Sequence, residues 1–252
     1  MTSARAGDDP KADHFRTAQD AIERADASQK RPVIFIHGLW SKPSSWQRWV
    51  EMFEAAGYAA LAPSWPAEAG GAAAPETMGE VVAHFAGIAA ALERRPGIVG
   101  QSFGGLIAQT LAGHGLSIAT VAIDPAPFRG VLPLPVSAAP VRPPNSQARD
   151  DADQAPAPGR PGFQATAENL NLWSETRADT EAVQRGPLLV ISTERDTIVP
   201  RSVARAAYEQ QKRDRHAITE FVQMADRGHS PMIDKGCLDV VQIALAFMAR
   251  FA

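Results

Sequence analysis

The chain has 252 residues, of which 45% are hydrophobic and 21% are charged. This composition excludes a disordered or fibrous protein, and the length suffices for a sizeable core. With 25 basic and 28 acidic residues the net charge is −3, which excludes a general attraction to nucleic acids or anionic membranes. Cys237 is the single cysteine, so an internal disulfide and a cysteine-rich zinc site are also excluded.

Residues 1–31 are polar and charged, with a weak helical pattern around Phe15 and Ile22. We interpret them as an N-terminal polar extension on the surface. They contain no apolar stretch typical of a secretory signal, and no run in the chain reaches the length that spans a bilayer. The sequence therefore predicts a cytoplasmic protein without a membrane span.

Residues 32–252 alternate between short apolar runs and longer helical patterns. The runs typical of strands buried on both faces are 33–36, 58–62, 97–100, 118–123, 187–192 and 218–222. The helical patterns cover 46–56, 77–94, 103–112, 202–211 and 238–251. Strands alternating with helices predict a single α/β domain, in which a mostly parallel sheet carries helices on both faces.

A proline-rich insertion at about residues 126–185 interrupts this alternation. Eight prolines fall between Val131 and Gly162, so neither a helix nor a central strand can run through that stretch. A long insertion between two strands favours a cap or lid over the site, and a flexible surface excursion is the alternative. Residues 165–176, which have a helical pattern, are the part expected to pack down.

The clearest chemical motif is Gly100-Gln101-Ser102-Phe103-Gly104, which lies between a predicted strand and a predicted helix. A Gly-x-Ser-x-Gly sequence in that position predicts a nucleophile elbow, a sharp turn that exposes the serine hydroxyl. Glycine on both sides of Ser102 leaves room for the turn.

A serine nucleophile needs a base, and six histidines are available. His229 lies in the loop between the last strand and the last helix, where an imidazole can reach the carboxyl ends of the strands. His37 follows the first strand, and we interpret it as architectural. Surface or helix positions explain the remaining four: His14, His84, His114 and His216.

Two carboxylates compete for the role of orienting the histidine. Asp196 and Asp124 each follow a buried strand on the ligand side of an open α/β sheet. Asp196 is favoured because its strand lies closer to His229 along the sheet. Asp124 has the simpler explanation of a turn residue before Pro125.

The developing oxyanion of a serine hydrolase needs backbone N–H donors. Phe103 directly follows the serine at the start of a helix, and its N–H is one candidate. Leu39 lies in the loop after the first strand, where Gly38 allows the chain to bend, and its N–H is the other.

In the order and spacing of these motifs, the chain resembles the α/β-hydrolase-fold serine hydrolases of the esterase and lipase type. The resemblance covers about residues 32–125 and 186–252, and it implies the triad Ser102, Asp196 and His229 without a metal or cofactor. Two features depart from the family: Gln101 stands where many relatives have histidine, and the family's first two strands lack counterparts in residues 1–31.

The predicted substrate pocket is apolar, with Trp40, Phe128, Trp173 and Met232 as the lining candidates. The expected activity is hydrolysis of uncharged, apolar carboxylic esters, either small molecules or polymers. The same triad also serves lactone, polyester and carbon–carbon bond hydrolysis and perhydrolysis in similar proteins. A ligand-binding protein without catalysis is the alternative of another class.

Overall fold

The computed structural model describes residues 17–39, 41–66, 77–128, 131 and 178–251, and its core is one six-stranded sheet. The strands are β1 (Arg31–Ile36), β2 (Tyr58–Leu61), β3 (Gly97–Gln101), β4 (Ala119–Ile123), β5 (Leu188–Thr193) and β6 (Thr219–Met224). They lie in the order β2-β1-β3-β4-β5-β6, and every neighbouring pair is parallel. The predicted parallel sheet is confirmed.

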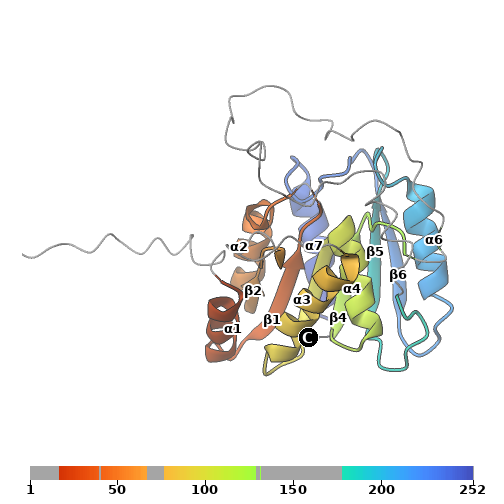
Figure 1. The fold of residues 1–252 in the computed structure, drawn as a ribbon. Helices are drawn as coiled ribbons and strands as arrows, with labels where there is room; N and C mark the ends of the chain where they lie inside the picture. The colour runs from red at the N-terminus through yellow and green to blue at the C-terminus, as the bar shows by residue number, and fades with distance from the viewer. Residues whose placement is uncertain (1–16, 40, 67–76, 129–130, 132–177, 252) are drawn as a thin grey trace, which may run out of the picture.

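Helices cover both faces of this sheet, as predicted (Figure 1). On one face lie α1 (Ala18–Ala27), α3 (Met78–Ala91), α4 (Phe103–Gly113) and α6 (Arg201–Gln211). On the other face lie the 3-10 turn η2 (Pro43–Trp46), α2 (Gln47–Ala55) and α7 (Cys237–Met248).

The side chains of β1 show how the two faces are built. Ile34 and Ile36 pack under α3 and α4, whereas Val33 and Phe35 point to the opposite layer. The Phe35 ring contacts the buried ring of Trp46 there, at a centroid distance of 5.3 Å. Since consecutive strand residues point to opposite faces, a continuous apolar run is what a strand covered on both sides requires.

The segment predicted as a polar extension contains a helix that packs on the domain. Thr17 caps α1 by accepting a hydrogen bond from the Asp20 N–H at 3.3 Å. Ala21, Ile22 and Ala25 are buried in the core layer beneath α1. Two of these three side chains are alanine methyl groups, so the helix lies close to its neighbours while showing few large apolar residues in its sequence.

A second close contact fixes α4 against the sheet. A Cβ placed on Gly100 would lie 2.0 Å from the carbonyl oxygen of Gly104, and one placed on Gly104 would lie 2.0 Å from that of Ile36. Both distances are far below any van der Waals contact. The N-terminus of α4 therefore approaches β1 and β3 so closely that a side chain at Gly100 or Gly104 would not fit.

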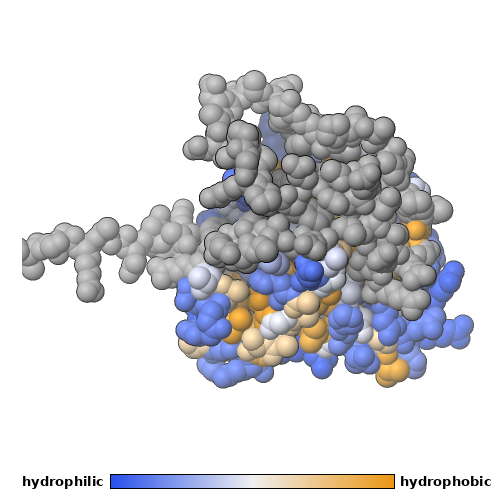
Figure 2. All heavy atoms as spheres, in the orientation of Figure 1, coloured by the Kyte–Doolittle hydropathy of each residue, from blue (hydrophilic) through white to orange (hydrophobic). Residues whose placement is uncertain are grey.

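The solvent face of α3, unlike the start of α4, has room for an added methyl group. Hydrophobic and near-neutral residues gather over α3 in Figure 2, with hydrophilic residues around them. The exposed positions of α3 include small residues, among them Ala83, Gly87 and Ala90. A Cβ on Gly87 would meet nothing within 4 Å.

Replacing Gly104 and Gly87 with alanine tests this packing. We expect Gly104→Ala to lower the free energy of unfolding by about 3 kcal/mol or more, because the new methyl group collides with the backbone of β1. Gly87→Ala should raise it by about 0.5–1 kcal/mol, because alanine is the better helix former. Urea unfolding measures both, and a Gly104→Ala protein as stable as the wild type would contradict the close contact.

Candidate active site

Ser102 occupies a sharp turn between β3 and α4. Its φ of 55° and ψ of −119° lie outside the regions that an L-residue ordinarily adopts. Its N–H donates to the carbonyl of Ile123 at 2.9 Å, and its carbonyl accepts from the N–H groups of Leu106 and Ala126 at 3.1 and 3.0 Å. The hydrogen bonds on both sides hold the strained residue, as the predicted elbow requires.

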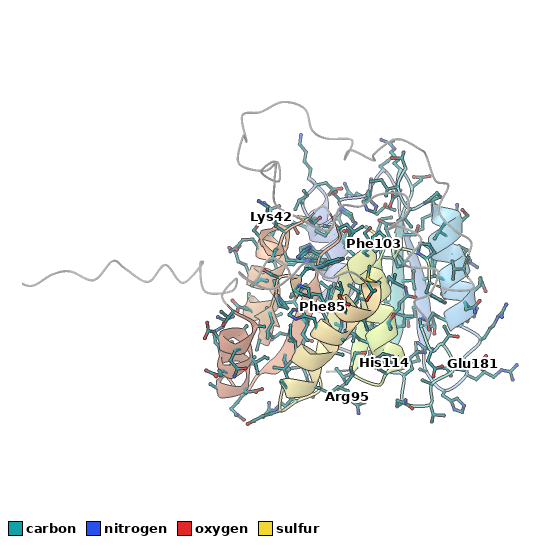
Figure 3. The ribbon with its side chains drawn as sticks, viewed as in Figure 1. Lys42, Phe85, Arg95, Phe103, His114 and Glu181 are labelled. Atoms are coloured by element: carbon teal, nitrogen blue, oxygen red, sulfur yellow. The ribbon has the colours of Figure 1, made fainter. Side chains whose placement is uncertain are left out.

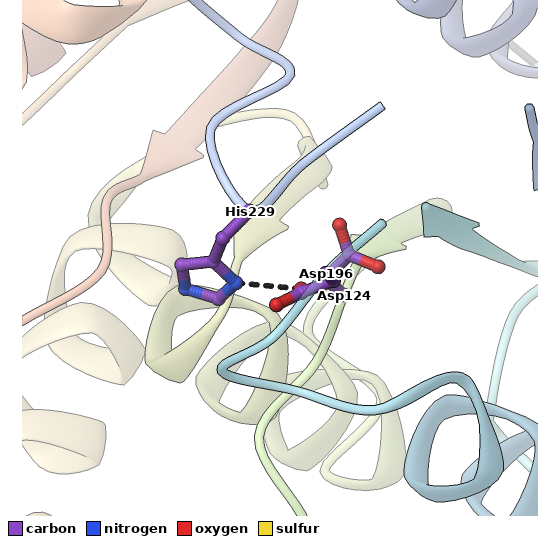
Figure 4. Close-up of side chains that lie close together, drawn as sticks. All are labelled: Asp124, Asp196 and His229. Atoms are coloured by element: carbon purple, nitrogen blue, oxygen red, sulfur yellow. Dashed lines mark hydrogen bonds and ion pairs between the residues drawn. The ribbon is translucent and has the colours of Figure 1, made fainter. Parts of the chain in front are cut away.

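His229 lies next to this serine, in the loop that follows β6. Its Nε2 is 3.1 Å from the Oγ of Ser102, and its Nδ1 is 2.6 Å from Oδ2 of Asp196. Figure 4 shows the hydrogen bond to Asp196, with Asp124 beside it. The structure thus brings together the three residues that sequence analysis assigned to the triad.

Asp196 is held by its own turn. Its Oδ1 accepts hydrogen bonds from the N–H groups of Ile198 and Val199, at 2.7 and 2.9 Å, and its side chain is fully buried. The remaining oxygen is directed at His229. Two backbone N–H groups and one imidazole nitrogen thus hold the Asp196 side chain in a fixed orientation.

Asp124, the competing carboxylate, makes different contacts. Its φ is 40°, and its two oxygens lie 2.7 Å from the N and from the Oγ1 of Thr193. Burial raises the pKa of the Asp124 carboxyl well above its usual range, and the charge of Asp196 raises it further, whereas the hydrogen bonds from Thr193 lower it. The geometry pairs His229 with Asp196 and leaves Asp124 to Thr193.

Gln101 also contacts the histidine, which sequence analysis did not predict. Its Nε2 donates to the carbonyl of His229 at 2.7 Å and lies 3.2 Å from the ring Nε2. The side chain is almost fully buried. The one signal in the sequence was that the residue before the serine differs from the histidine common in similar proteins.

The turn after β1 lies against the serine. A Cβ on Gly38 would be 2.9 Å from Oε1 of Gln101 and 3.1 Å from Cβ of Ser102. Leu39 directly follows Gly38, and Phe103 directly follows Ser102 as the first residue of α4. Figure 3 shows Phe103 and His114 at opposite ends of α4.

His37 has structural partners. Its Nδ1 is 2.9 Å from the carbonyl oxygen of Gly38, and its ring stacks on that of Trp65 with 5.8 Å between the centroids. The indole N–H of Trp65 donates to the His37 carbonyl at 3.2 Å. These contacts agree with an architectural role in shaping the loop that carries Leu39.

The four lining candidates divide into two groups. Phe128 and Met232 are almost completely buried, and they belong to the core layers on opposite faces of the sheet. Trp40 and Trp173 lie outside the described residues, as does most of the predicted cap. Pocket lining remains a prediction for all four.

Asp124, Asp196 and His229 each offer one potential metal ligand, and these three atoms lie within 4.8 Å of one another. Protein hydrogen bonds already occupy them, because His229 pairs with Asp196 and Asp124 pairs with Thr193. The arrangement suits proton transfer better: an imidazole that donates from Nδ1 to Asp196 has a lone pair on Nε2 to accept the Ser102 proton.

Comparison with known families agrees with the fold. Residues 33–243 match the model of the alpha/beta hydrolase family. The chain belongs to this family. Among curated proteins, no sequence matches the chain significantly.

Solved structures show the same fold at low sequence identity. The monoacylglycerol lipase of Paleococcus ferrophilus has a TM-score of 0.67 and 17% identity, covering 88% of this chain and 95% of its own. BpoC of Mycobacterium tuberculosis H37Rv, which carries the name of a non-heme bromoperoxidase, scores 0.65 with 21% identity, over 88% and 93%. A pyrethroid hydrolase of Sphingobium faniae JZ-2 scores 0.60 with 20% identity, over 86% and 96%.

These comparisons confirm the predicted α/β-hydrolase fold. Within the described part of the chain, no helix has the length and apolar character needed to cross a membrane.

Proposed function

We propose that the protein is a serine hydrolase that cleaves carboxylic esters through the triad Ser102, His229 and Asp196. The observation that carries this proposal is the continuous hydrogen-bonded path from the Ser102 hydroxyl through the His229 ring to the Asp196 carboxylate, at 3.1 and 2.6 Å. Membership of the alpha/beta hydrolase family supports a hydrolase in general.

The proposed reaction begins when Ser102 attacks the ester carbonyl while His229 takes the hydroxyl proton at Nε2. The N–H groups of Leu39 and Phe103 are the proposed donors to the oxyanion that forms. His229 then returns the proton to the leaving alcohol, and the acyl group remains on Ser102. Water, activated by the same imidazole, releases the acid and restores the serine.

Asp196 contributes orientation and charge. Its bond to Nδ1 selects the tautomer whose Nε2 can accept the serine proton, and its negative charge stabilises the imidazolium that forms during attack. The N–H groups of Ile198 and Val199 hold its other oxygen, so the carboxylate is already in place before the substrate arrives.

The proposed substrates are uncharged, apolar esters of small molecules or polymers. The apolar residues predicted around the site support this class, and two of the similar structures are a monoacylglycerol lipase and a pyrethroid hydrolase. Lactone, polyester or carbon–carbon bond hydrolysis, or perhydrolysis, are the alternative uses of the triad. An aligned triad argues against a purely ligand-binding role.

Ser102→Ala tests the nucleophile. We expect a fluorophosphonate to label the wild type covalently and to leave the variant unlabelled, because the attacking oxygen is gone while little packing is lost. Mass spectrometry of the intact protein measures the adduct, and full labelling of the variant would contradict the assignment. A panel of p-nitrophenyl esters, aryl lactones and a 2,6-dioxo acid then ranks the substrate classes by turnover.

Asp196→Asn tests the acid. We expect kcat to fall by about 10⁴-fold, the effect of the same change in serine proteases, because an amide favours the wrong imidazole tautomer. Asp226→Asn is the matched control: it removes the same charge from a side chain that is 70% exposed and pairs with Arg195 at the surface, so kcat should stay within about twofold. Equal kcat values for the two variants would overturn the role of Asp196.

Gln101→Leu tests the contact between the elbow and the histidine loop. The variant loses the hydrogen bond donated to the His229 carbonyl, worth about 1 kcal/mol, so we expect kcat to fall roughly fivefold to tenfold. Gln19→Leu makes the same chemical change at an exposed position of α1 and should not affect kcat. A Gln101→Leu enzyme with wild-type kcat would show that Gln101 does not position the base.

A further inference from the structure

The hydrogen bonds around Thr193 require one proton more than an ionised Asp124 can provide. The Thr193 Oγ1 lies 2.7 Å from Oδ2 of Asp124 and 3.0 Å from the carbonyl oxygen of Gly228. A threonine hydroxyl has one proton, and a carbonyl oxygen can only accept. If Asp124 were a carboxylate, one of the two contacts would be a close approach of two oxygens with no proton between them.

A neutral carboxylic acid satisfies both contacts. Oδ1 of Asp124 accepts the N–H of Thr193 at 2.7 Å, so Oδ1 is the carbonyl oxygen and Oδ2 carries the proton. The acid then donates from Oδ2 to Thr193 Oγ1, and Thr193 donates to the Gly228 carbonyl. Each oxygen in the chain has a matching partner.

We propose that Asp124 is a positioning residue: its carboxyl proton completes a hydrogen-bond chain through Thr193 to the carbonyl of Gly228 and so holds the loop that carries His229. This inference rests on the proposed function, since His229 matters as a base only if the protein is a serine hydrolase. Asp124 acts on the reaction through this loop and contacts no reacting atom.

The surroundings of Asp124 favour its neutral form. The side chain is completely buried, and in the described part of the chain the titratable groups that face it are Asp196, after β5, and His229, after β6. Burial raises the pKa of Asp124 first, and the charge of Asp196 acts in the same direction. Two carboxylates this close together in a buried site do not both ionise readily.

The loop that carries His229 is held at several points, and the proposed chain is one of them. Gly228 directly precedes the histidine, and its carbonyl is the atom that Thr193 reaches. Gln101 holds the carbonyl of His229 itself at 2.7 Å, and the N–H of Arg195 donates to the Arg227 carbonyl at 2.8 Å. Loss of the middle contact would let the imidazole move relative to Ser102.

Substitutions at Asp124 and Thr193 test whether Asp124 acts as a neutral hydrogen-bond donor or as a charged carboxylate. Asparagine reproduces the neutral acid, because its oxygen can accept from Thr193 N–H and its NH₂ can donate to Thr193 Oγ1. We expect Asp124→Asn to keep kcat within about tenfold and Asp124→Ala to lower kcat by about 10²-fold with little change in KM, since a misplaced base costs that much. Thr193→Val, which lacks the hydroxyl, should lower kcat by as much as Asp124→Ala. Thr193→Ser, which keeps the hydroxyl, should have a kcat near that of the wild type.

The pH dependence of the melting temperature tests whether Asp124 carries the proton. A carboxyl whose pKa is raised in the folded state stabilises the protein at low pH, and this contribution is lost as pH rises through the folded pKa. Asparagine does not titrate. The melting temperature of Asp124→Asn, measured against the wild type from pH 5 to 9, should therefore rise relative to the wild type with increasing pH.

The outcomes distinguish the possibilities. If Asp124→Asn loses as much kcat as Asp124→Ala, the charge is required and the proposal is wrong; it is equally wrong if Asp124→Ala and Thr193→Val keep wild-type kcat. If the difference in melting temperature is the same at every pH, Asp124 is not the proton carrier. If wild-type protein fails to react with fluorophosphonate, the proposed function fails instead, and the pH comparison still tests the hydrogen-bond chain.

Discussion

The parallel alignment of the strands is the constraint on which the rest of the site depends. Because neighbouring strands run in the same direction, the segments that follow β1, β3, β4, β5 and β6 all emerge at one edge of the sheet. Ser102 and His229, which are 127 residues apart in the chain, meet there within hydrogen-bonding distance. Each of these five segments carries a residue of the candidate site, and the sheet aligns the segments.

This alignment also places two carboxylates side by side, and their neighbours give them different roles. Asp196 is surrounded by donors: two backbone N–H groups and an imidazole. Asp124 faces the hydroxyl of Thr193, whose single proton is needed for the hydrogen bond to the Gly228 carbonyl. The oxygens of Asp196 find donors without a proton of their own, whereas the proposed chain through Thr193 needs a proton on Asp124. The number of available donors, rather than residue type, separates the two aspartates.

Sequence patterns predicted the sheet, most of its helices and the elbow at Ser102, because each of these has a local signature. The proposed partners His229 and Asp196 were chosen by their place after predicted strands, and Asp124 had a similar place. Short apolar runs indicate buried strands, and Gly100 to Gly104 indicate the elbow. The packing of α1 had no such signature, since Ala21 and Ala25 bury little area each. The contacts of Gln101 and Thr193 with the histidine loop depend on chain segments far apart in sequence, which no local pattern reports.

The glycine contacts at the start of α4 bear on how the protein folds. Gly104 lies against the backbone of β1, and the imidazole that faces Ser102 comes from beyond β6, so the elbow is completed only when distant segments have assembled. Contacts between residues so far apart in sequence require loop closure before they stabilise the chain, and they slow folding. On the proposed mechanism, Ser102 lacks its base in a partly folded chain and behaves as an ordinary alcohol there. Its reactivity with an electrophile therefore reports the arrival of the native state during refolding.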